Sequence, residues 1–285
     1  MELCNAAVIG ALLERHGFHF AKSMGQNFLI DAAVPEAIAA ASGADESCGV
    51  LEIGPGIGAL SAQLCRRAGK VTAVELDRRL LPILDETMAD FSNFRVISDD
   101  ILKVDLPALV REEFTGLRPI VCANLPYNIT TPALTALIES GCFESITVLV
   151  QKEVAQRLCA KPGTAAYGAF SVFMQYYTEP VYCFEVPREC FRPAPKVTSA
   201  VLHARVRQTP PVAVADEKEF FRTVYAAFAL RRKTLVNSLM TAYGVQRSKE
   251  EITDAVASCG LSPTVRGETL GLDDFAALCR ALNGK

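Results

Sequence analysis

The sequence contains no tryptophan, three histidines and no CxxC pair of cysteines. Its ten cysteines are scattered, and most lie inside apolar runs such as Ile120-Val121-Cys122. This distribution is typical of reduced, buried thiols in a cytoplasmic protein and not of a disulfide framework or a zinc site. His16 and His19 are the one close histidine pair and have no third ligand near them in the sequence, so we predict no bound metal.

The chain also lacks a long apolar run, since none approaches the ~18–20 residues of a membrane span. The first segment carries Glu2 and no basic leader, so we expect an amphipathic helix there and not a secretory signal. With 285 residues, half of them hydrophobic, the chain is long enough for a large core and for two domains. We expect a cytoplasmic protein with no membrane partner.

An excess of positive charge is missing too, because the net charge is −3. This total argues against a nucleic-acid partner, but binding depends on local patches of cations. The basic residues gather in two places, and the candidate phosphate contacts are Arg188, Arg192 and Lys196 in one cluster and Arg231, Arg232 and Lys233 in the other. The alternative for the second cluster is a solvated helix face; Thr234, Asn237 and Ser238 nearby, as neutral phosphate donors, favour binding.

Strand and helix patterns alternate through the first two thirds of the chain. Buried runs such as 50–53, 71–75 and 120–123 each lead into a polar turn and then a helical pattern. This order predicts a parallel, doubly wound α/β sheet. The runs 180–186 and 197–206 have no helix-length spacer between them and predict an antiparallel hairpin that closes the sheet. Gln208-Thr209-Pro210-Pro211 marks a domain boundary, after which the periodicity is helical.

The turn Gly54-Pro55-Gly56-Ile57-Gly58-Ala59 predicts a nucleotide-like cofactor. Its GxGxxA pattern, with Glu75 twenty-one residues after Gly54, also fits a nicotinamide dinucleotide. However, Glu52 stands where a pyrophosphate would bind, and Asp100 follows the next strand. These acids suit a ligand with a cationic centre, ribose hydroxyls and adenine but no phosphate, which describes S-adenosylmethionine. A solvated turn is the alternative for Asp99-Asp100.

The stretch Asn124-Leu125-Pro126-Tyr127 follows a buried strand, at the edge where open α/β sheets bind ligands. An amide oxygen and the carbonyl of the prolyl segment can accept the N–H hydrogens of an adenine amine, and tyrosine offers a flat face to an unstacked base. A simple strand-to-loop turn uses the same residue types and is the alternative.

These motifs together resemble those of the ribosomal RNA small-subunit adenine dimethyltransferases. The resemblance covers roughly residues 10 to 280, and rests on seven segments, which are K22-S-M-G-Q-N-F-L29, E52-I-G-P-G-I-G58 with E75, D99-D-I-L102, N124-L-P-Y127, V150 to L158, F191-R-P-A-P-K-V-T-S-A-V201 and R231 to L239. Thr198 stands where the family commonly has Asp, and Met24 where it more usually has Leu.

The resemblance implies S-adenosylmethionine-dependent transfer of two methyl groups to N6 of each of two adjacent adenosines in the 3′-terminal hairpin loop of 16S rRNA, during ribosome biogenesis. It assigns the cofactor to Gln26, Asn27, Leu29, Glu52, Gly54, Gly56, Glu75, Asp100 and Asn124, with S-adenosylhomocysteine as product. It assigns the target base to Asn124, Pro126, Tyr127 and Phe191. A core aromatic is the alternative for Phe191.

The fold implied is a doubly wound class I methyltransferase (Rossmann-like) sheet with a C-terminal antiparallel hairpin and a small all-α C-terminal domain. We expect residues 1–208 to form the methyltransferase domain, with a cofactor-covering loop in 1–45, and 212–285 to form a helical RNA-binding domain. The partner expected is the small-subunit precursor, bound by a monomer. Three alternatives stay open: a 23S rRNA adenine N6-methyltransferase of the macrolide-resistance type, a non-catalytic nucleic-acid-binding relative and a dehydrogenase.

Overall fold

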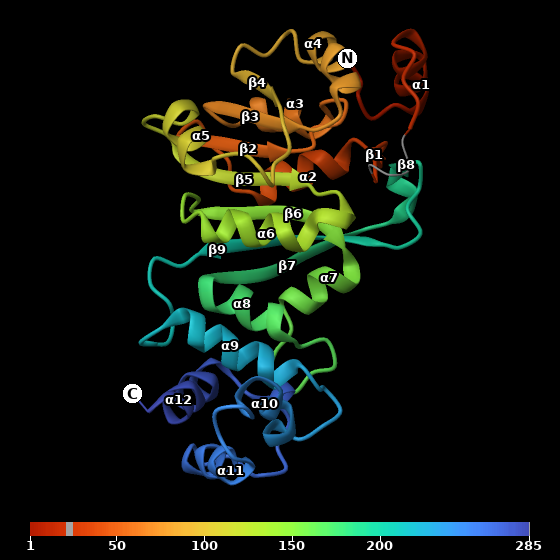
Figure 1. Ribbon diagram of the computed structural model, residues 1–285. Coiled ribbons are helices and arrows are strands. Elements are labelled where there is room, and N and C mark those ends of the chain that lie inside the picture. The colour runs from red at the N-terminus through yellow and green to blue at the C-terminus, as the bar shows by residue number, and fades with distance from the viewer. Residues whose placement is uncertain (21–24, 285) are drawn as a thin grey trace. The chain divides into compact units, whose positions relative to one another are not determined.

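The computed structural model of the protein describes residues 1–20 and 25–284 and divides them between two compact units (Figure 1). The first unit comprises Met1–Ala155 and Val181–Val206. The second comprises Gln156–Pro180 and Arg207–Lys285. Residues 22–24, the first part of the motif segment K22-S-M-G-Q-N-F-L29, lie outside the described residues.

The main sheet has seven strands in the described part of the chain, in the order β4-β3-β2-β5-β6-β9-β7. Strands β2 to β6 run parallel, and β9 pairs with β6 in the antiparallel direction. The predicted doubly wound sheet closed by antiparallel strands is therefore confirmed. The strand bounds are β2 Cys48–Ile53, β3 Lys70–Glu75, β4 Phe94–Ser98, β5 Arg118–Asn124, β6 Ser145–Gln151, β7 Thr178–Val186 and β9 Ser199–Val206.

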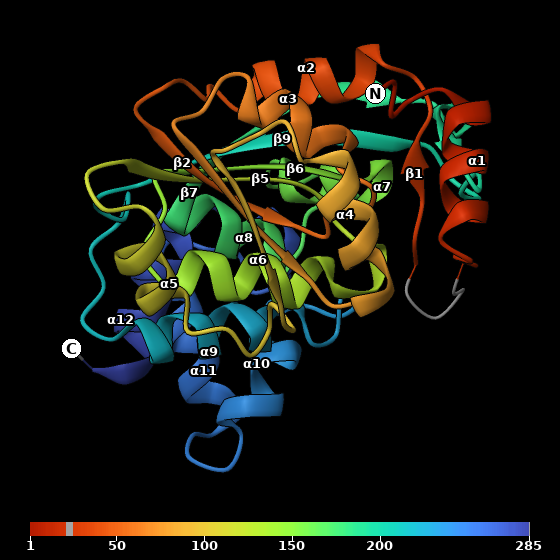
Figure 2. The ribbon, with the colours of Figure 1, turned by 90° about the horizontal axis from the view of Figure 1, so that it is seen from above.

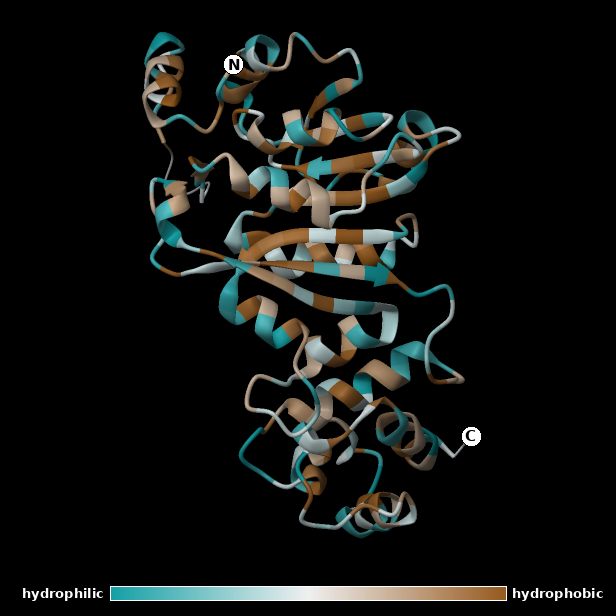
Figure 3. Ribbon diagram, turned by 180° about the vertical axis from the view of Figure 1, so that it is seen from behind, coloured by the Kyte–Doolittle hydropathy of each residue, from teal (hydrophilic) through white to brown (hydrophobic). Residues whose placement is uncertain are grey.

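Helices cover both faces of this sheet, with α2 and α3 on one side and α5 and α6 on the other (Figure 2). A strand covered on both faces is apolar along most of its length, because neither set of side chains reaches water. All six residues of β2 are buried, and the strands appear brown over much of their length in Figure 3. The helix bounds in this unit are α1 Ala6–Arg15, α2 Ala33–Ala41, α3 Ala59–Cys65, α4 Leu81–Thr87, α5 Leu106–Glu113 and α6 Thr130–Glu139; α7, Lys152–Leu158, continues into the second unit.

Two very short strands, β1 (Phe28–Leu29) and β8 (Phe191–Arg192), form a separate antiparallel sheet. Phe28 lies opposite Arg192, and Leu29 lies opposite Phe191. The sequence predicted a cofactor-covering loop within residues 1–45, and β1 lies in that range. The partner could not be foreseen, because two-residue strands leave no periodicity to detect. The pairing joins the N-terminal signature to the FxPxPK segment.

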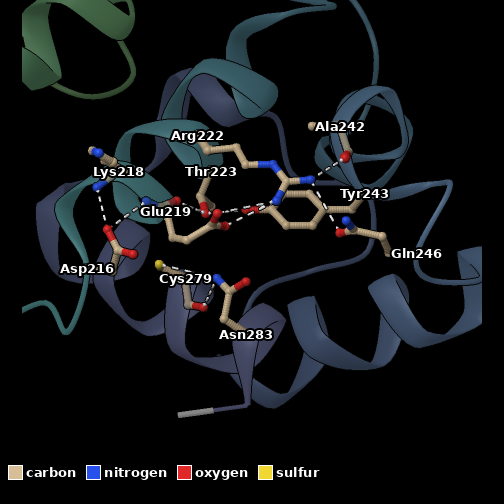
Figure 4. A network of polar contacts seen from close by, with 10 residues as sticks. All are labelled: Asp216, Lys218, Glu219, Arg222, Thr223, Ala242, Tyr243, Gln246, Cys279 and Asn283. Carbon is tan, nitrogen blue, oxygen red and sulfur yellow. Dashed lines mark hydrogen bonds and ion pairs between the residues drawn. The ribbon is translucent and has the colours of Figure 1, made fainter.

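The second unit is helical and has its own apolar core, built from residues such as Tyr176, Phe220 and Phe275. Figure 4 shows a polar network between its helices. The Thr223 and Tyr243 hydroxyls lie 2.8 Å apart, and the Arg222 guanidinium carbon lies 4.6 Å from the centre of the Tyr243 ring. The helices are α8 Ala169–Tyr177, α9 Glu217–Phe228, α10 Leu235–Tyr243, α11 Lys249–Ser258 and α12 Leu272–Asn283.

The division into units differs from the one predicted near residues 208–212. The chain does pass into the second unit after Val206, but Gln156–Pro180 belongs to the second unit as well. Within this unit, the Tyr176 ring packs 5.0 Å from that of Phe220, and the Tyr176 hydroxyl donates to Glu217. The sequence pattern did not reveal this because α8 follows the sheet strands along the chain without any composition break.

No helix within residues 1–20 and 25–284 combines the length and the apolar character needed to cross a bilayer. The same residues contain no group of three or more His, Cys, Asp or Glu side chains placed to hold a metal ion. All ten cysteines are free, and four of them are buried, namely Cys48, Cys65, Cys122 and Cys279.

Candidate active site

A cavity of about 270 Å³ opens in the first unit, at the carboxyl ends of β2, β3 and β5. In a parallel sheet these ends meet at one edge, which is where open α/β sheets bind ligands. Every residue predicted to bind the cofactor lines this cavity, and so do Pro126 and Tyr127. The lining comes from 25–29, 52–57, 59–60, 74–76, 80, 99–102 and 124–129.

The glycine turn between β2 and α3 lets the backbone come close to this cavity. Gly54, Gly56 and Gly58 have φ values of +66°, +60° and +90°, a region that residues with a Cβ rarely adopt. A Cβ on Gly56 would also lie 3.1 Å from the Phe28 ring of β1. The turn is therefore shaped by glycine for two reasons, backbone conformation and close packing against the N-terminal segment.

Glu52 is a buried carboxyl group without a complete set of partners. Its side chain is 1 % exposed, and Oε2 accepts no hydrogen bond from the described residues. Burial and, to a smaller extent, the nearby charge of Glu75 raise the pKa of Glu52 to about 8, against an opposing effect of the Ser61 hydroxyl. Leaving a buried polar atom unpaired costs free energy, so an orphaned acid in a cavity marks a place for a donor that a ligand brings.

Glu75, at the end of β3, is also buried, but it is held by backbone groups. The N–H of Asp77 donates to its Oε1 at 2.7 Å. Burial raises the pKa of Glu75 to about 7, while backbone N–H groups, including that of Gly56, oppose the rise. Since backbone N–H groups hold this carboxyl group in place, it presents acceptors to the cavity in a defined orientation.

Gln26 reaches the same wall through Asp77. The Gln26 amide donates to Asp77 Oδ2 at 2.8 Å, and Arg79 binds both oxygens of this carboxylate at 2.8 and 2.6 Å. The Arg79 guanidinium carbon lies 5.0 Å from the Phe18 ring centre, and its NH1 donates to the carbonyl of His19. Through these contacts Asp77 and Arg79 hold Phe18, His19 and Gln26 of the N-terminal segment beside the cavity. The sequence motifs did not indicate this role.

Asp100 follows β4 in a turn whose geometry is set by Asp99. The Asp100 N–H donates to Asp99 Oδ1 at 2.7 Å, and Asp100 Oδ1 accepts from the Leu102 N–H at 3.1 Å. Leu76 and Leu102 line the cavity although they are 56 % and 42 % exposed. These apolar walls were not predicted from the sequence. The signal for them was a large aliphatic residue directly after Glu75 and another just beyond Asp100, in otherwise polar turns.

Asn124 ends β5, and its amide group is oriented by one hydrogen bond. Nδ2 donates to the carbonyl of Asn27 at 3.3 Å, while Oδ1 accepts from none of the described residues. The carbonyl of Pro126, predicted as an acceptor for the substrate amine, already accepts from the Ile129 N–H at 3.2 Å and from the Thr130 hydroxyl at 3.4 Å. Leu125 offers the other carbonyl here, and it accepts from no described donor.

Tyr127 lines the cavity, whereas Phe191 does not. The Tyr127 hydroxyl lies 2.6 Å from that of Ser199, and the residue is partly buried in the short helical turn η3, Tyr127–Ile129. Phe191 is 2 % exposed and packs in the core of the first unit, with Leu29 opposite it across the β1–β8 ladder. Phe191, which the resemblance assigns to the target base, is therefore covered by protein in this structure.

In the two predicted basic clusters, some side chains are bonded to other groups of the protein and others are exposed to solvent. In the first unit, Arg188 pairs with Glu189 at 2.9 Å and Arg192 donates to the Ala6 carbonyl at 3.3 Å, while Lys196 is exposed. In the second unit, Arg231 donates to the carbonyls of Ala165 and Tyr167 at 2.8 and 3.2 Å.

The second cluster lies between two helices. Arg231, Arg232 and Lys233 occupy the turn between α9 and α10 and not a helix face, and Arg232 and Lys233 are exposed there. Ser238, considered as a phosphate donor, is buried, where it donates to the Ala226 carbonyl at 2.8 Å. Its hydroxyl stabilises the end of α9 and is covered by protein.

Comparison with known proteins adds three findings. Residues 17–260 match the family described as "Ribosomal RNA adenine dimethylase". The chain is 49 % identical to ribosomal RNA small subunit methyltransferase A of Streptococcus pneumoniae, over 100 % of this chain and 99 % of that protein. The protein of that name from Shouchella clausii is 46 % identical, over 99 % of this chain and 96 % of the relative.

Solved structures show the same fold. The 23S rRNA methyltransferase ErmE superposes with a TM-score of 0.69 at 25 % identity, covering 90 % of this chain and 99 % of that one. A dimethyladenosine transferase from Plasmodium falciparum superposes with a TM-score of 0.73 at 23 % identity, covering 88 % of this chain and 95 % of that one.

Proposed function

Because the chain belongs to the ribosomal RNA adenine dimethylase family, we propose that it uses S-adenosylmethionine to dimethylate N6 of two adjacent adenosines near the 3′ end of small-subunit rRNA. Family membership gives the enzyme class, an rRNA adenine dimethyltransferase, and confirms the resemblance drawn from the sequence motifs. The identity of the methyl donor, the position in the rRNA and the role of each residue are the proposal. We further propose that the protein is a cytoplasmic monomer and that it acts on the precursor of the small ribosomal subunit.

The single observation that carries the donor assignment is the unpartnered oxygen of Glu52 inside the cavity. An ammonium group satisfies a buried carboxylate, whereas a pyrophosphate would bring only acceptor oxygens and further negative charge to two buried acids. The residues therefore fit S-adenosylmethionine better than a dinucleotide. When bound, this cofactor would supply an electrophilic methyl group on a sulfonium centre and leave as S-adenosylhomocysteine.

Each of the other cavity residues would contact the part of the methyl donor that matches its own chemistry. Glu75, oriented by the Asp77 N–H, would accept from the ribose hydroxyls. Leu76 and Leu102 would cover the adenine faces, and Asp100 would accept from the adenine amine. Gln26, Asn27 and Leu29 come from the N-terminal segment and would exclude water from the methionine part. A dry site helps because the reaction disperses the sulfonium charge.

For the substrate amine, the free acceptors are Asn124 Oδ1 and the carbonyl of Leu125. An adenine amine is a weak nucleophile because its lone pair is delocalised into the ring. In the first transfer, two acceptors that hold its two N–H groups would favour the pyramidal nitrogen, whose lone pair is then free to attack. We therefore move the carbonyl role from Pro126 to Leu125, since the Pro126 oxygen is already engaged. We assign no dedicated base among the described residues of the cavity, so the amine proton would be lost to solvent with or after transfer.

Methylation of isolated ribosomal subunits tests the proposal. Small subunits from cells that lack this modification are incubated with the protein and S-adenosylmethionine labelled in its methyl group, and the modified bases are mapped. We expect two methyl groups on each of two adjacent adenosines in the small-subunit rRNA. Label in large subunits alone would favour a 23S-type enzyme, and donor binding without transfer to any RNA would favour a non-catalytic relative.

A further inference from the structure

We propose that Ser199 is a positioning residue for the substrate adenine, because its hydroxyl group fixes the ring of Tyr127 beside Asn124. The inference rests on the proposed function and names a residue to which the sequence motifs assigned no role. Ser199 does not line the cavity and would not touch the substrate. It acts through Tyr127, which does line it.

The contact joins two elements that are far apart in the sequence. Tyr127 begins η3, three residues after Asn124, and Ser199 is the first residue of β9. Their hydroxyl oxygens lie 2.6 Å apart, a short distance for two neutral hydroxyls. Ser199 is fully buried, and burial raises the pKa of Tyr127. Both groups are therefore neutral hydroxyls that need each other as partners, since leaving either one unpaired would cost free energy.

Ser199 is a rigid anchor because of its place in the sheet. It pairs with Gln151 at the end of a ladder between β6 and β9 that extends to Ser145 and Arg205. The neighbouring N–H of Lys152 donates to the carbonyl of Thr198 at 3.0 Å. Regular backbone pairing therefore fixes the position of Ser199, which is one partner of the hydroxyl contact.

Tyr127 is fixed at both of its ends as a result. Its backbone belongs to the segment that carries the substrate acceptors, and its hydroxyl is held by β9. The long axis of the ring, from Cβ to the hydroxyl, is therefore set relative to Asn124 Oδ1. Phe191 is covered in this structure, whereas Tyr127 borders the cavity three residues after Asn124. A misplacement of about 1 Å can cost on the order of 10²-fold in rate, so control of this axis is a kinetic matter.

A double-mutant cycle tests the inference. Ser199→Ala and Tyr127→Phe each delete the same hydrogen bond from opposite ends, and Ser199→Thr keeps the hydroxyl. Thr147→Val is the matched control, since it removes another fully buried hydroxyl from the β6–β9 pair, one that bonds His203 at 2.8 Å. Each protein is assayed for methylation of small subunits, for S-adenosylmethionine affinity and for unfolding.

We expect Ser199→Ala and Tyr127→Phe to lower kcat about tenfold, within the range for a misplaced reacting group. Donor affinity should stay within about twofold of wild type, and the double variant should lose no more than the worse single one. Ser199→Thr should recover most of the rate, and Thr147→Val should keep wild-type kcat.

Three results would overturn the inference: a wild-type kcat in Tyr127→Phe, rate losses that multiply in the double variant, or an equal loss in Thr147→Val. Tyr127→Phe decides the matter alone if Ser199→Ala fails to fold. If the wild-type protein itself methylates no rRNA, the proposed function fails and takes this inference with it, a result distinct from active bond-deletion variants.

Discussion

At the scale of single residues, two buried carboxyl groups face one cavity, and neither has a cationic side chain as a partner among the described residues. Glu52 and Glu75 have pKa values raised to about 8 and about 7. In the unliganded protein a proton therefore replaces the missing cation at neutral pH. Binding an ammonium group would displace that proton, because the positive charge favours the ionised carboxylate.

The raised pKa of Glu52 gives a prediction for stability without ligand. The folded protein binds this proton more tightly than the unfolded chain, so the free energy of unfolding should fall as pH rises from about 4.5 through 8. Glu52→Gln has no such proton. Between pH 5 and pH 8 its free energy of unfolding should fall by roughly 2–4 kcal/mol less than that of the wild type. Urea denaturation at both pH values measures this.

Glu46→Gln is the control for that experiment, because Glu46 is exposed on the surface of the same unit. Its stability profile should run parallel to that of the wild type. A Glu52→Gln profile that also runs parallel would contradict the raised pKa of Glu52.

Asn124 gives the residue-scale prediction for catalysis. Asn124→Ala removes the free Oδ1 and the bond to the Asn27 carbonyl. We expect a loss in kcat of at least about 10²-fold, as for other groups that hold a reacting atom, with unchanged unfolding. Label transfer to small subunits measures the rate, and near-normal activity would remove Asn124 from the proposed mechanism.

The sequence predicted these residues well because each one lies at a strand end beside a recognisable turn. Glu52, Glu75, Asp100 and Asn124 all line the one cavity. The roles of Asp77, Arg79 and Ser199 could not be predicted, because each depends on a contact across the chain. The same limit explains the Pro126 carbonyl, whose occupation by the Ile129 N–H appears only once η3 has formed.

At the scale of elements, the turn between β2 and α3 and the strand β1 depend on each other. Gly56 sits under the Phe28 ring, and Phe28 packs in turn against Phe18 and Phe20, with ring centres 6.1 and 5.2 Å away. A turn that any glycine-rich motif can make thus acquires a second constraint from the N-terminal segment. The motif predicted the turn, but the aromatic cover needed the folded chain.

Gly56→Ala tests this dependence. Alanine at φ +60° is strained by about 1–2 kcal/mol, and its Cβ would push against Phe28. We expect donor affinity and the free energy of unfolding to fall together. Gly10→Ala in α1 is the comparison, since no atom lies within 4 Å of its added Cβ and a helical alanine should stabilise by about 0.5–1 kcal/mol. Equal effects of the two substitutions would refute the argument; calorimetry of binding and of unfolding measures both.

At the scale of the whole molecule, a net charge of −3 coexists with local cations that face solvent. Some acidic and basic side chains neutralise each other in pairs, as Glu113 does with Lys70 and Arg95. The basic side chains available to bind a polyanion are those without an acidic partner. Composition cannot reveal this, and it explains why the total charge was a poor guide to the partner.

Arg232→Ala combined with Lys233→Ala should weaken rRNA binding about equally for all sequences. It should also lower the slope of log affinity against log salt by about one for each phosphate that the variant no longer neutralises. Stability should stay unchanged, because both side chains are exposed. Arg231→Ala should instead destabilise the second unit, since it loses bonds to Ala165 and Tyr167. RNA titrations at several salt concentrations, with melting curves, separate the two cases. An unchanged salt slope in the double variant would exclude these cations from binding.

The pairing of β1 with β8 has a consequence for how the two ligands influence each other. One strand belongs to the segment proposed to cover the donor, and the other carries Phe191, which the family resemblance assigns to the target base. The ladder continues where the Ile30 N–H donates to the Cys190 carbonyl at 2.8 Å. Because each strand completes the backbone bonds of the other, ordering one favours ordering the other. Donor and RNA binding should therefore be cooperative, and reciprocity requires each ligand to raise the affinity of the other by the same factor.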